Sequence, residues 1–183
     1  VLFRSVDFVR TVTAEEMYDW DDITSETDPE PTKYKVLVTD CGLKYNILRL
    51  LRQRGCQVIA VPAATSAEDM LAMNPSGILF SPGPGDPQLL DYLEVNLRKL
   101  LGRVPVMGIC LGHQIAARAL GAKTYKLKFG HRGANHPVQD VASKRVYITA
   151  QNHGYAVDPD SLPTGLEISH LDLNDGTIEG LRH

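Results

Sequence analysis

The sequence of 183 residues lacks the features of several protein classes. It has three cysteines, Cys41, Cys56 and Cys110, and no C-x-x-C pair, which fits a reducing compartment better than a disulfide framework or a zinc site. No apolar stretch approaches the about 18 residues of a membrane span, and the first residues contain no signal-peptide apolar region. We therefore expect a cytoplasmic protein that does not associate with membranes.

The sequence also lacks a large excess of one charge and the common nucleotide-binding and zinc-binding motifs. Lys and Arg together number 19 against 22 Asp and Glu, and no long basic run indicates a nucleic-acid surface. A G-x-G-x-x-G fingerprint would need glycine where Gln88 stands, and no G-x-x-x-x-G-K-[ST] occurs. H-E-x-x-H is absent, and His131 and His136 are five apart, which suits no helical zinc pair. We expect neither a metal site nor a bound cofactor in this chain.

The sequence does contain a regular alternation of strand and helix patterns. Short apolar runs predict strands at 34–39, 57–61, 77–80 and 104–109. Apolar residues at helical spacing predict helices at 46–54, after a capping box at Thr65-Ser66-Ala67-Glu68, at 89–100, and from His113. This order predicts an α/β fold, a doubly wound and mostly parallel sheet with helices on both faces.

After Gly121, where a helix should stop, the pattern changes to a mainly antiparallel C-terminal portion. Strands are predicted at 124–129, 145–150, 166–173 and 177–181, with a hairpin turn at Asn174-Asp175-Gly176 before the last of them.

Both ends of the chain suggest a fragment. Residues 1–33 have no sustained period and are acidic from Glu15 to Glu30, so we expect a linker or the end of a preceding domain. Alternatively, Val6 to Trp20 is a tail of the domain that follows. Residues 34–183 are expected to form that domain, cut before its C-terminal end because the last strand has no terminating turn.

Cys110 is the candidate nucleophile. The near-continuous apolar run from Val104 to Ile109 predicts a strand covered on both faces, and Gly108-x-Cys110-x-Gly112 has the spacing of a nucleophile elbow with cysteine in place of serine. A thiol at a helix N-terminus is biased toward the reactive thiolate, and the N–H of the next residue can supply half of an oxyanion hole. A small buried cysteine in a tight turn is the alternative.

Two other clusters are rich in glycine or amides. Ser81 to Pro87 (SPGPGDP) follows a predicted strand, and its glycines permit close approach to an oxygen atom, although a stiff connection would look the same. Gln151 to Tyr155 (QNHGY) either contacts a polar ligand or forms only a turn. Since parallel strands end at one edge of a sheet, we expect the SPGPGDP loop beside the Cys110 elbow.

Together these motifs resemble one family. GICLGHQ, SPGPGDP, KFGHRGANHPV and AQNHGYAV are similar to the class I (triad) glutamine amidotransferase domain of the carbamoyl-phosphate synthetase small chain, from about Lys33 to the end. SPGPG and G-x-C-x-G are shared with sister amidotransferases such as the anthranilate synthase component, whereas DCGLKYNILRLL, KFGHRGANHPV and AQNHGYAV are more specific. Pro82 stands where the family often has asparagine. The implied fold is flavodoxin-like.

The resemblance implies a glutaminase. Cys110 would form a γ-glutamyl thioester and release ammonia, with oxyanion-hole amides from Leu111 and Gly83. Glutamine would be bound by Gly85, Leu111, Gln114, Asn152, Gly154 and Tyr155. Ammonia would pass to a large synthetase subunit or fused domain, which holds ATP and magnesium and makes carbamoyl phosphate from bicarbonate for arginine and pyrimidine biosynthesis.

The sequence departs from the family at the general base. The family has a histidine followed two residues later by glutamate, in a His-Pro-Glu run, whereas the one His-Pro here, His136-Pro137, precedes Val138. We expect the histidine and glutamate of the triad to lie beyond residue 183, and this chain alone to be a poor glutaminase. Alternatives are a sister amidotransferase, a non-catalytic binding subunit that resembles an amidotransferase, and a cysteine hydrolase of another amide or ester.

Overall fold

The computed structural model describes residues 6–23 and 32–183. The chain divides into two compact units, Val1–Ala116 and Ala117–His183. The close of the predicted acidic linker, residues 24–31, lies outside the described residues. No helix within the described ranges is long and apolar enough to cross a membrane.

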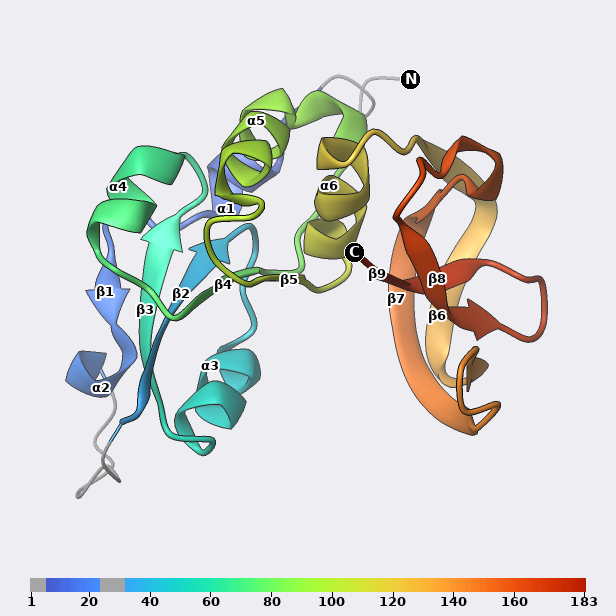
Figure 1. Ribbon diagram of the computed structural model, residues 1–183, viewed down its shortest axis with the longest axis horizontal. Helices are drawn as coiled ribbons and strands as arrows, with labels where there is room; N and C mark the ends of the chain where they lie inside the picture. The colour runs from blue at the N-terminus through green and yellow to red at the C-terminus, as the bar shows by residue number, and fades with distance from the viewer. Residues whose placement is uncertain (1–5, 24–31) are drawn as a thin grey trace. The chain divides into compact units, whose positions relative to one another are not determined.

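The first unit is built on a five-stranded sheet with the order β1-β3-β2-β4-β5 (Figure 1). The strands are β1 (Tyr18–Asp19), β2 (Tyr34–Asp40), β3 (Cys56–Pro62), β4 (Gly77–Phe80) and β5 (Val106–Gly108). All neighbours pair in parallel except β1, which runs antiparallel to β3. Because β2 has β3 on one side and β4 on the other, the winding reverses there, and ligands of such sheets bind beyond the carboxyl ends of the strands.

Helices cover both faces of this sheet, as the alternating pattern predicts (Figure 1). They are α3 (Tyr45–Arg52), α4 (Ala67–Ala72), α5 (Asp91–Leu100) and α6 (Leu111–Ala119), with two short helices, α1 (Val9–Val12) and α2 (Trp20–Ile23), before them. Val38 packs with Leu48 of α3, whereas the next residue, Thr39, places its Oγ1 3.8 Å from Met70 Sδ of α4. Successive strand residues face opposite sides, so α3 and α4 lie on opposite faces.

Residues 6–23 pack onto the sheet. Val9 is fully buried and Trp20 nearly so, and Tyr18 pairs with Ala60 of β3. This packing favours the interpretation of Val6 to Trp20 as part of the adjoining domain, whereas the boundary at residue 33 stays a prediction.

Two details near β5 differ from the sequence-based expectation. The strand is Val106–Gly108 rather than 104–109, and coverage of both faces is wrong, because Met107 is 58% exposed and β5 is the edge strand of the described sheet. An apolar run shows that a strand can be buried but not its position in the sheet. Helix α6 also begins at Leu111, two residues before the predicted His113.

The capping prediction for α4 is wrong by one residue. Ser66, not Thr65, is the N-cap, and its Oγ accepts a hydrogen bond from the backbone N–H of Asp69 at 3.0 Å. Both hydroxyl residues fit the pattern, and the sequence alone does not distinguish them.

The Ser66→Ala substitution should therefore lower the free energy of unfolding by about 1 kcal/mol, since it leaves an amide of the first turn without its acceptor. Thr65→Ala is the matched control and should change stability by less than half as much. Urea unfolding of both variants checks this, and equal losses would contradict the assignment of the cap.

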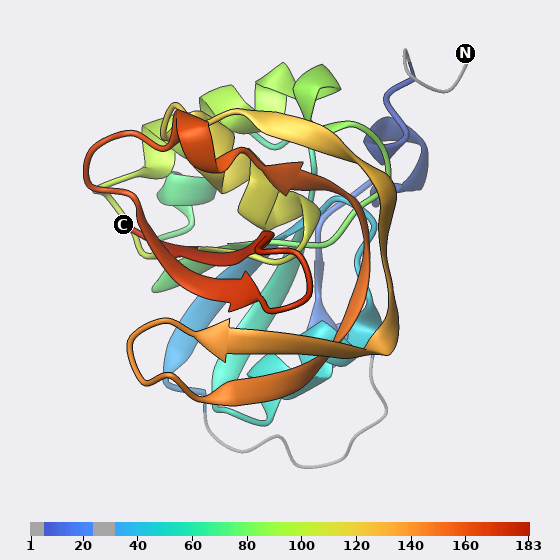
Figure 2. The ribbon, with the colours of Figure 1, turned by 90° about the vertical axis from the view of Figure 1, so that its right-hand side faces the viewer.

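The second unit contains a closed barrel with the order β6-β7-β9-β8 (Figure 2). Its strands are β6 (Thr124–Asp140), β7 (Val146–Val157), β8 (Glu167–Asp172) and β9 (Ile178–Arg182), all paired antiparallel. The turn at 174–176 is present, and Gly121 ends α6 with a φ of 107°. QNHGY, expected to be a ligand contact or a turn, lies inside β7, where β6 supplies its backbone partners.

Candidate active site

Cys110 occupies a strained turn between β5 and α6. Its φ is 54°, one of three positive values at non-glycine residues within the described ranges. On its two sides, Ile109 N–H donates to Phe80 O at 3.0 Å and Gln114 N–H donates to Cys110 O at 3.1 Å, so the chain passes directly from sheet to helix. A left-handed conformation costs a cysteine energy and is typical of nucleophiles held at a strand-to-helix turn.

The two flanking glycines are required by space. A Cβ on Gly108 would overlap the backbone of Gly112 and His113, and a Cβ on Gly112 would overlap the carbonyl of Phe80. Neither glycine has a positive φ, so their absence of a side chain, rather than backbone freedom, explains them. The predicted crowding at positions two before and two after Cys110 is confirmed.

The SPGPGDP loop lies beside the start of α6. A Cβ on Gly83 would lie 2.6 Å from Cδ2 of Leu111 and would overlap the carbonyl oxygen of Cys41. Ser81 Oγ fixes the loop by accepting from Cys41 N–H at 2.9 Å. Leu111 is the first residue of α6, and first-turn N–H groups have no partner within their own helix. The structure thus brings Gly83, Cys110 and Leu111 together, as expected.

The three cysteines differ in their surroundings. Cys110 is only partly buried, whereas Cys41 is completely buried and Cys56 is 8% exposed. Burial, and then the nearby Asp40 carboxylate, raises the pKa of Cys41 to about 12. Cys41 is therefore a protonated thiol at neutral pH and a poor nucleophile, which leaves Cys110 as the cysteine suited to covalent chemistry.

The predicted substrate-binding residues fall in both units. In the first, Gln114 lies one helical turn after Cys110 and is buried, with 5% of the residue exposed. Gly85 has a φ of 99° in the SPGPGDP loop. In the second, Asn152, Gly154 and Tyr155 lie on β7, where Asn152 pairs with Arg132 of β6. The binding roles of all these residues stay predictions.

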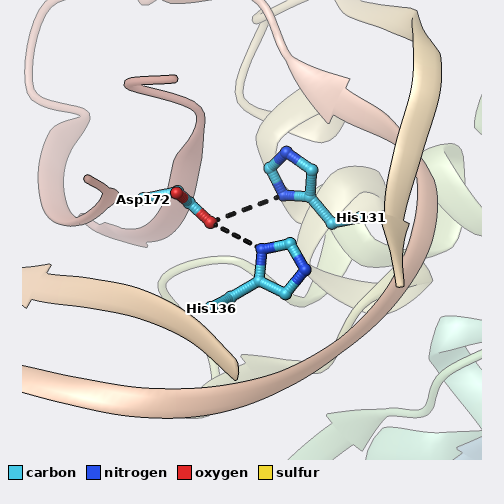
Figure 3. Close-up of side chains that lie close together, drawn as sticks. All are labelled: His131, His136 and Asp172. Carbon is cyan, nitrogen blue, oxygen red and sulfur yellow. Dashed lines mark hydrogen bonds and ion pairs between the residues drawn. The ribbon is translucent and has the colours of Figure 1, made fainter. Parts of the chain in front are cut away.

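The sequence does not reveal one side-chain cluster inside the barrel. His131, His136 and Asp172 place a ligand-type atom each within 4.8 Å of one another (Figure 3), and so do His131, His153 and Glu179. Helical spacing is the wrong test for His131 and His136, because both lie on β6, whose register shifts on either side of Gly133. The signal that could have found them is the recurrence of histidine in both glycine-rich motifs.

Sequence comparison decides the family. The family model described as "Glutamine amidotransferase class-I" matches residues 37–183. The chain belongs to the class I glutamine amidotransferase family. Its curated relatives include the "Carbamoyl phosphate synthase small chain" of Akkermansia muciniphila, 55% identical over 88% of this chain, and of Syntrophotalea carbinolica, 51% identical over 97%. The chloroplastic protein of Arabidopsis thaliana is 50% identical over 96%.

Solved amidotransferase structures share the fold. One is a putative GMP synthase protein from Thermoplasma acidophilum, with a TM-score of 0.71 and 20% sequence identity. The match covers 84% of this chain and 80% of the Thermoplasma chain. Another is a glutamine amidotransferase from Thermotoga maritima, with a TM-score of 0.63 and 19% sequence identity. The match covers 82% of this chain and 71% of the Thermotoga chain. These likenesses confirm the α/β fold of this class I amidotransferase.

This amidotransferase chain spans about half the length of the curated relatives it matches: 43% of the Akkermansia protein, 49% of the Syntrophotalea protein and 42% of the Arabidopsis protein. The activity and partners of a whole protein of that length are therefore proposals.

Proposed function

We propose that this chain is the glutamine-hydrolysing part of a carbamoyl phosphate synthase. The support is the name carried by relatives about 50% identical over nearly the whole chain. The single structural observation that carries the chemistry is the left-handed Cys110 between β5 and α6, with Gly83 packed against Leu111. An acyl transfer to sulfur requires a thiol near backbone N–H donors, and this packing supports the roles proposed for Cys110, Leu111 and Gly83.

The first step of the proposed reaction is attack on the side-chain amide of glutamine. The Cys110 thiolate forms a bond to the amide carbon, and the carbonyl electron pair moves to oxygen. The N–H groups of Leu111 and Gly83 stabilise this oxyanion. The carbon–nitrogen bond then breaks, the nitrogen takes up a proton and leaves as ammonia, and a γ-glutamyl thioester stays on sulfur.

The second step returns the enzyme to its starting state. Water adds to the thioester, the carbon–sulfur bond breaks, and glutamate leaves while the thiolate is restored. Both steps need a positioned acid and base, worth about 10²–10⁴ in rate. The proposal takes this group from the family's His-Pro-Glu run. The proposal does not assign this role to His136, the one histidine here that precedes proline, because Val138 and not glutamate follows Pro137.

The proposed partner is a large synthetase subunit or fused domain. It would bind ATP and magnesium and combine the released ammonia with bicarbonate, so this chain needs no cofactor of its own for glutamine hydrolysis. The free thiols of Cys41, Cys56 and Cys110 fit the reducing conditions of the cytoplasm, where we place this reaction.

Covalent trapping tests the proposed nucleophile. A chloromethyl ketone built on the glutamine skeleton should alkylate Cys110 in the full-length protein, because the thiolate displaces chloride and forms a stable thioether. Mass spectrometry of the digested protein locates the adduct, and excess glutamine should slow its formation. Labelling at the same rate by an analogue without the amino-acid part would favour a hydrolase of other esters or amides.

A second assay separates the proposed synthase from its alternatives. The protein with its synthetase partner should convert glutamine, bicarbonate and ATP to carbamoyl phosphate, and should not support anthranilate formation with the anthranilate synthase partner. No glutamine-dependent product with either partner would favour the non-catalytic binding subunit.

Replacing Gln114 by alanine should weaken glutamine binding without unfolding the first unit. The side chain is one turn from Cys110, and the loss of one hydrogen bond to a bound ligand, worth about 0.5–1.5 kcal/mol, corresponds to a rise in KM of about 2- to 12-fold. The control is Gln53→Ala at the exposed end of α3. An unchanged KM in Gln114→Ala, with Gln53→Ala also unchanged, would remove Gln114 from the binding site.

A further inference from the structure

Histidines and carboxylates gather inside the barrel of the second unit. The histidines are His131 and His136 on β6 and His153 on β7, and the carboxylates are Asp172 at the end of β8 and Glu179 on β9. The side chains of His153 and Glu179 are each 9% exposed, and that of Asp172 is fully buried. All the ion pairs that these two carboxylates make in the described structure are with histidines.

Three ligand-type atoms converge at one point of this cluster. Glu179 Oε1 lies 3.0 Å from His131 Nδ1 and 3.3 Å from His153 Nε2. Bonds of about 2.0–2.2 Å from a tetrahedral metal to nitrogen or oxygen place neighbouring ligand atoms about 3.3–3.6 Å apart. Asp172 Oδ2 lies 3.7 Å from His131 Nδ1 and is held by His136 Nδ1 at 3.0 Å (Figure 3). The two distances from Glu179 Oε1 are close to those of a coordination shell, and all three ligand atoms lie within 4.8 Å of one another.

The outer nitrogens of the two histidines fix which ring atoms face the cluster. His153 Nδ1 lies 2.9 Å from the backbone carbonyl of Tyr155, and His131 Nε2 lies 2.9 Å from Asp175 Oδ2. A carbonyl only accepts, so Nδ1 of His153 carries the hydrogen and a neutral ring presents a bare Nε2. That Nε2 is buried, and the group that faces it is Glu179 Oε1 at 3.3 Å. Metal-binding histidines are oriented in this way by a carbonyl or carboxylate on the outer nitrogen.

We propose that His131, His153 and Glu179 bind one divalent transition-metal ion, of which zinc fits this donor set best, with Asp172 as the nearest further oxygen ligand. Two imidazoles and one carboxylate suit zinc better than magnesium, which prefers oxygen ligands. A cation would balance the negative charge of the buried carboxylates and accept the electron pair of His153 Nε2. Asp175, whose Oδ2 lies 2.9 Å from His131 Nε2, has a side chain that is 46% exposed, so the site lies close to the protein surface. This inference is independent of glutamine hydrolysis.

Zinc binding to the tag-free, full chain tests the proposal. Cys110→Ser should be the background, so that the active-site thiol does not bind the metal. After removal of metal with a chelator, calorimetric titration with zinc chloride should show one ion bound per chain, a raised melting temperature, and no such response to magnesium. His153→Gln and Glu179→Gln should each weaken zinc binding more than tenfold.

His170→Gln is the matched control, because His170 lies on β8 but its Nδ1 contacts Ser169 Oγ instead of the cluster. It should bind zinc as the background protein does. Asp175→Asn keeps all ligands and should weaken binding about 10–100-fold through the orientation of His131. If His153→Gln and Glu179→Gln fail to fold, the zinc affinity of Asp175→Asn tests the proposed site in their place. Less than one zinc per chain at tens of micromolar, or equal binding by every variant, would overturn the proposal.

Discussion

Cys110→Ser is expected to abolish glutamine-dependent synthesis of carbamoyl phosphate, with glutamine turnover lowered by about 10⁴-fold or more, because loss of a nucleophile costs on that order. A serine hydroxyl at the same strained position is far less ionised than a thiol and attacks an amide poorly without a strong base. Synthesis from added ammonia should survive in the complex, since ammonia bypasses Cys110. Parallel assays of the full-length protein with its synthetase partner, with glutamine or ammonium chloride as the nitrogen source, measure both rates.

Cys56→Ser is the matched control. Cys56 is 8% exposed at the start of β3 and packs in the core beneath α3. Its replacement should lower stability slightly and leave the glutamine-dependent rate within about twofold. Glutamine use that persists in Cys110→Ser would show that another group is the nucleophile, and loss of the ammonia-dependent rate as well would indicate a structural defect instead.

The sequence predicts the first unit well because two strong signals agree there. Strand runs and helical spacing alternate with short connections, and β4 has its predicted bounds, Gly77–Phe80. Gly108, Cys110 and Gly112 predict the elbow correctly: a Cβ on Gly108 would overlap the backbone of Gly112 and His113 within the motif, although Gly112 itself is crowded by Phe80 of β4.

The errors of the sequence-based prediction arise where contacts between distant segments determine the position of a strand or side chain. The edge position of β5 depends on which strand pairs beside it, and Val104 to Ile109 carries no such information. Closure of the barrel does not follow from the sequence pattern, because β6 continues for 17 residues through glycines that read as turns. His131, His153 and Glu179 meet only because β6, β7 and β9 are paired, and their spacing in the sequence gives no hint of it.

Gly83→Ala should reduce glutamine-dependent turnover by about 10²–10³-fold, the cost of losing one oxyanion-hole donor. The added methyl group would overlap the Cys41 carbonyl and press on Cδ2 of Leu111 at 2.6 Å. Because the Cys41 backbone and the buried Leu111 side chain occupy the space on either side, the SPGPGDP loop itself would have to move. This movement would carry the Gly83 amide away from the developing oxyanion. A displacement of about 1 Å at a reacting centre is itself worth about 10²-fold.

The matched control is Gly77→Ala at the start of β4, where a Cβ would lie 3.6 Å from Pro105 O, an ordinary contact. It should retain glutamine turnover within about twofold. Because Gly83→Ala strains the loop, its stability is measured by urea unfolding at the same time, and the ammonia-dependent rate reports whether the complex still assembles. If Gly83→Ala stays folded and keeps its ammonia-dependent rate, the loss confined to glutamine assigns the Gly83 amide to the oxyanion hole. Wild-type glutamine turnover in that folded variant would remove Gly83 from the site and leave Leu111 as the one oxyanion donor proposed in this chain.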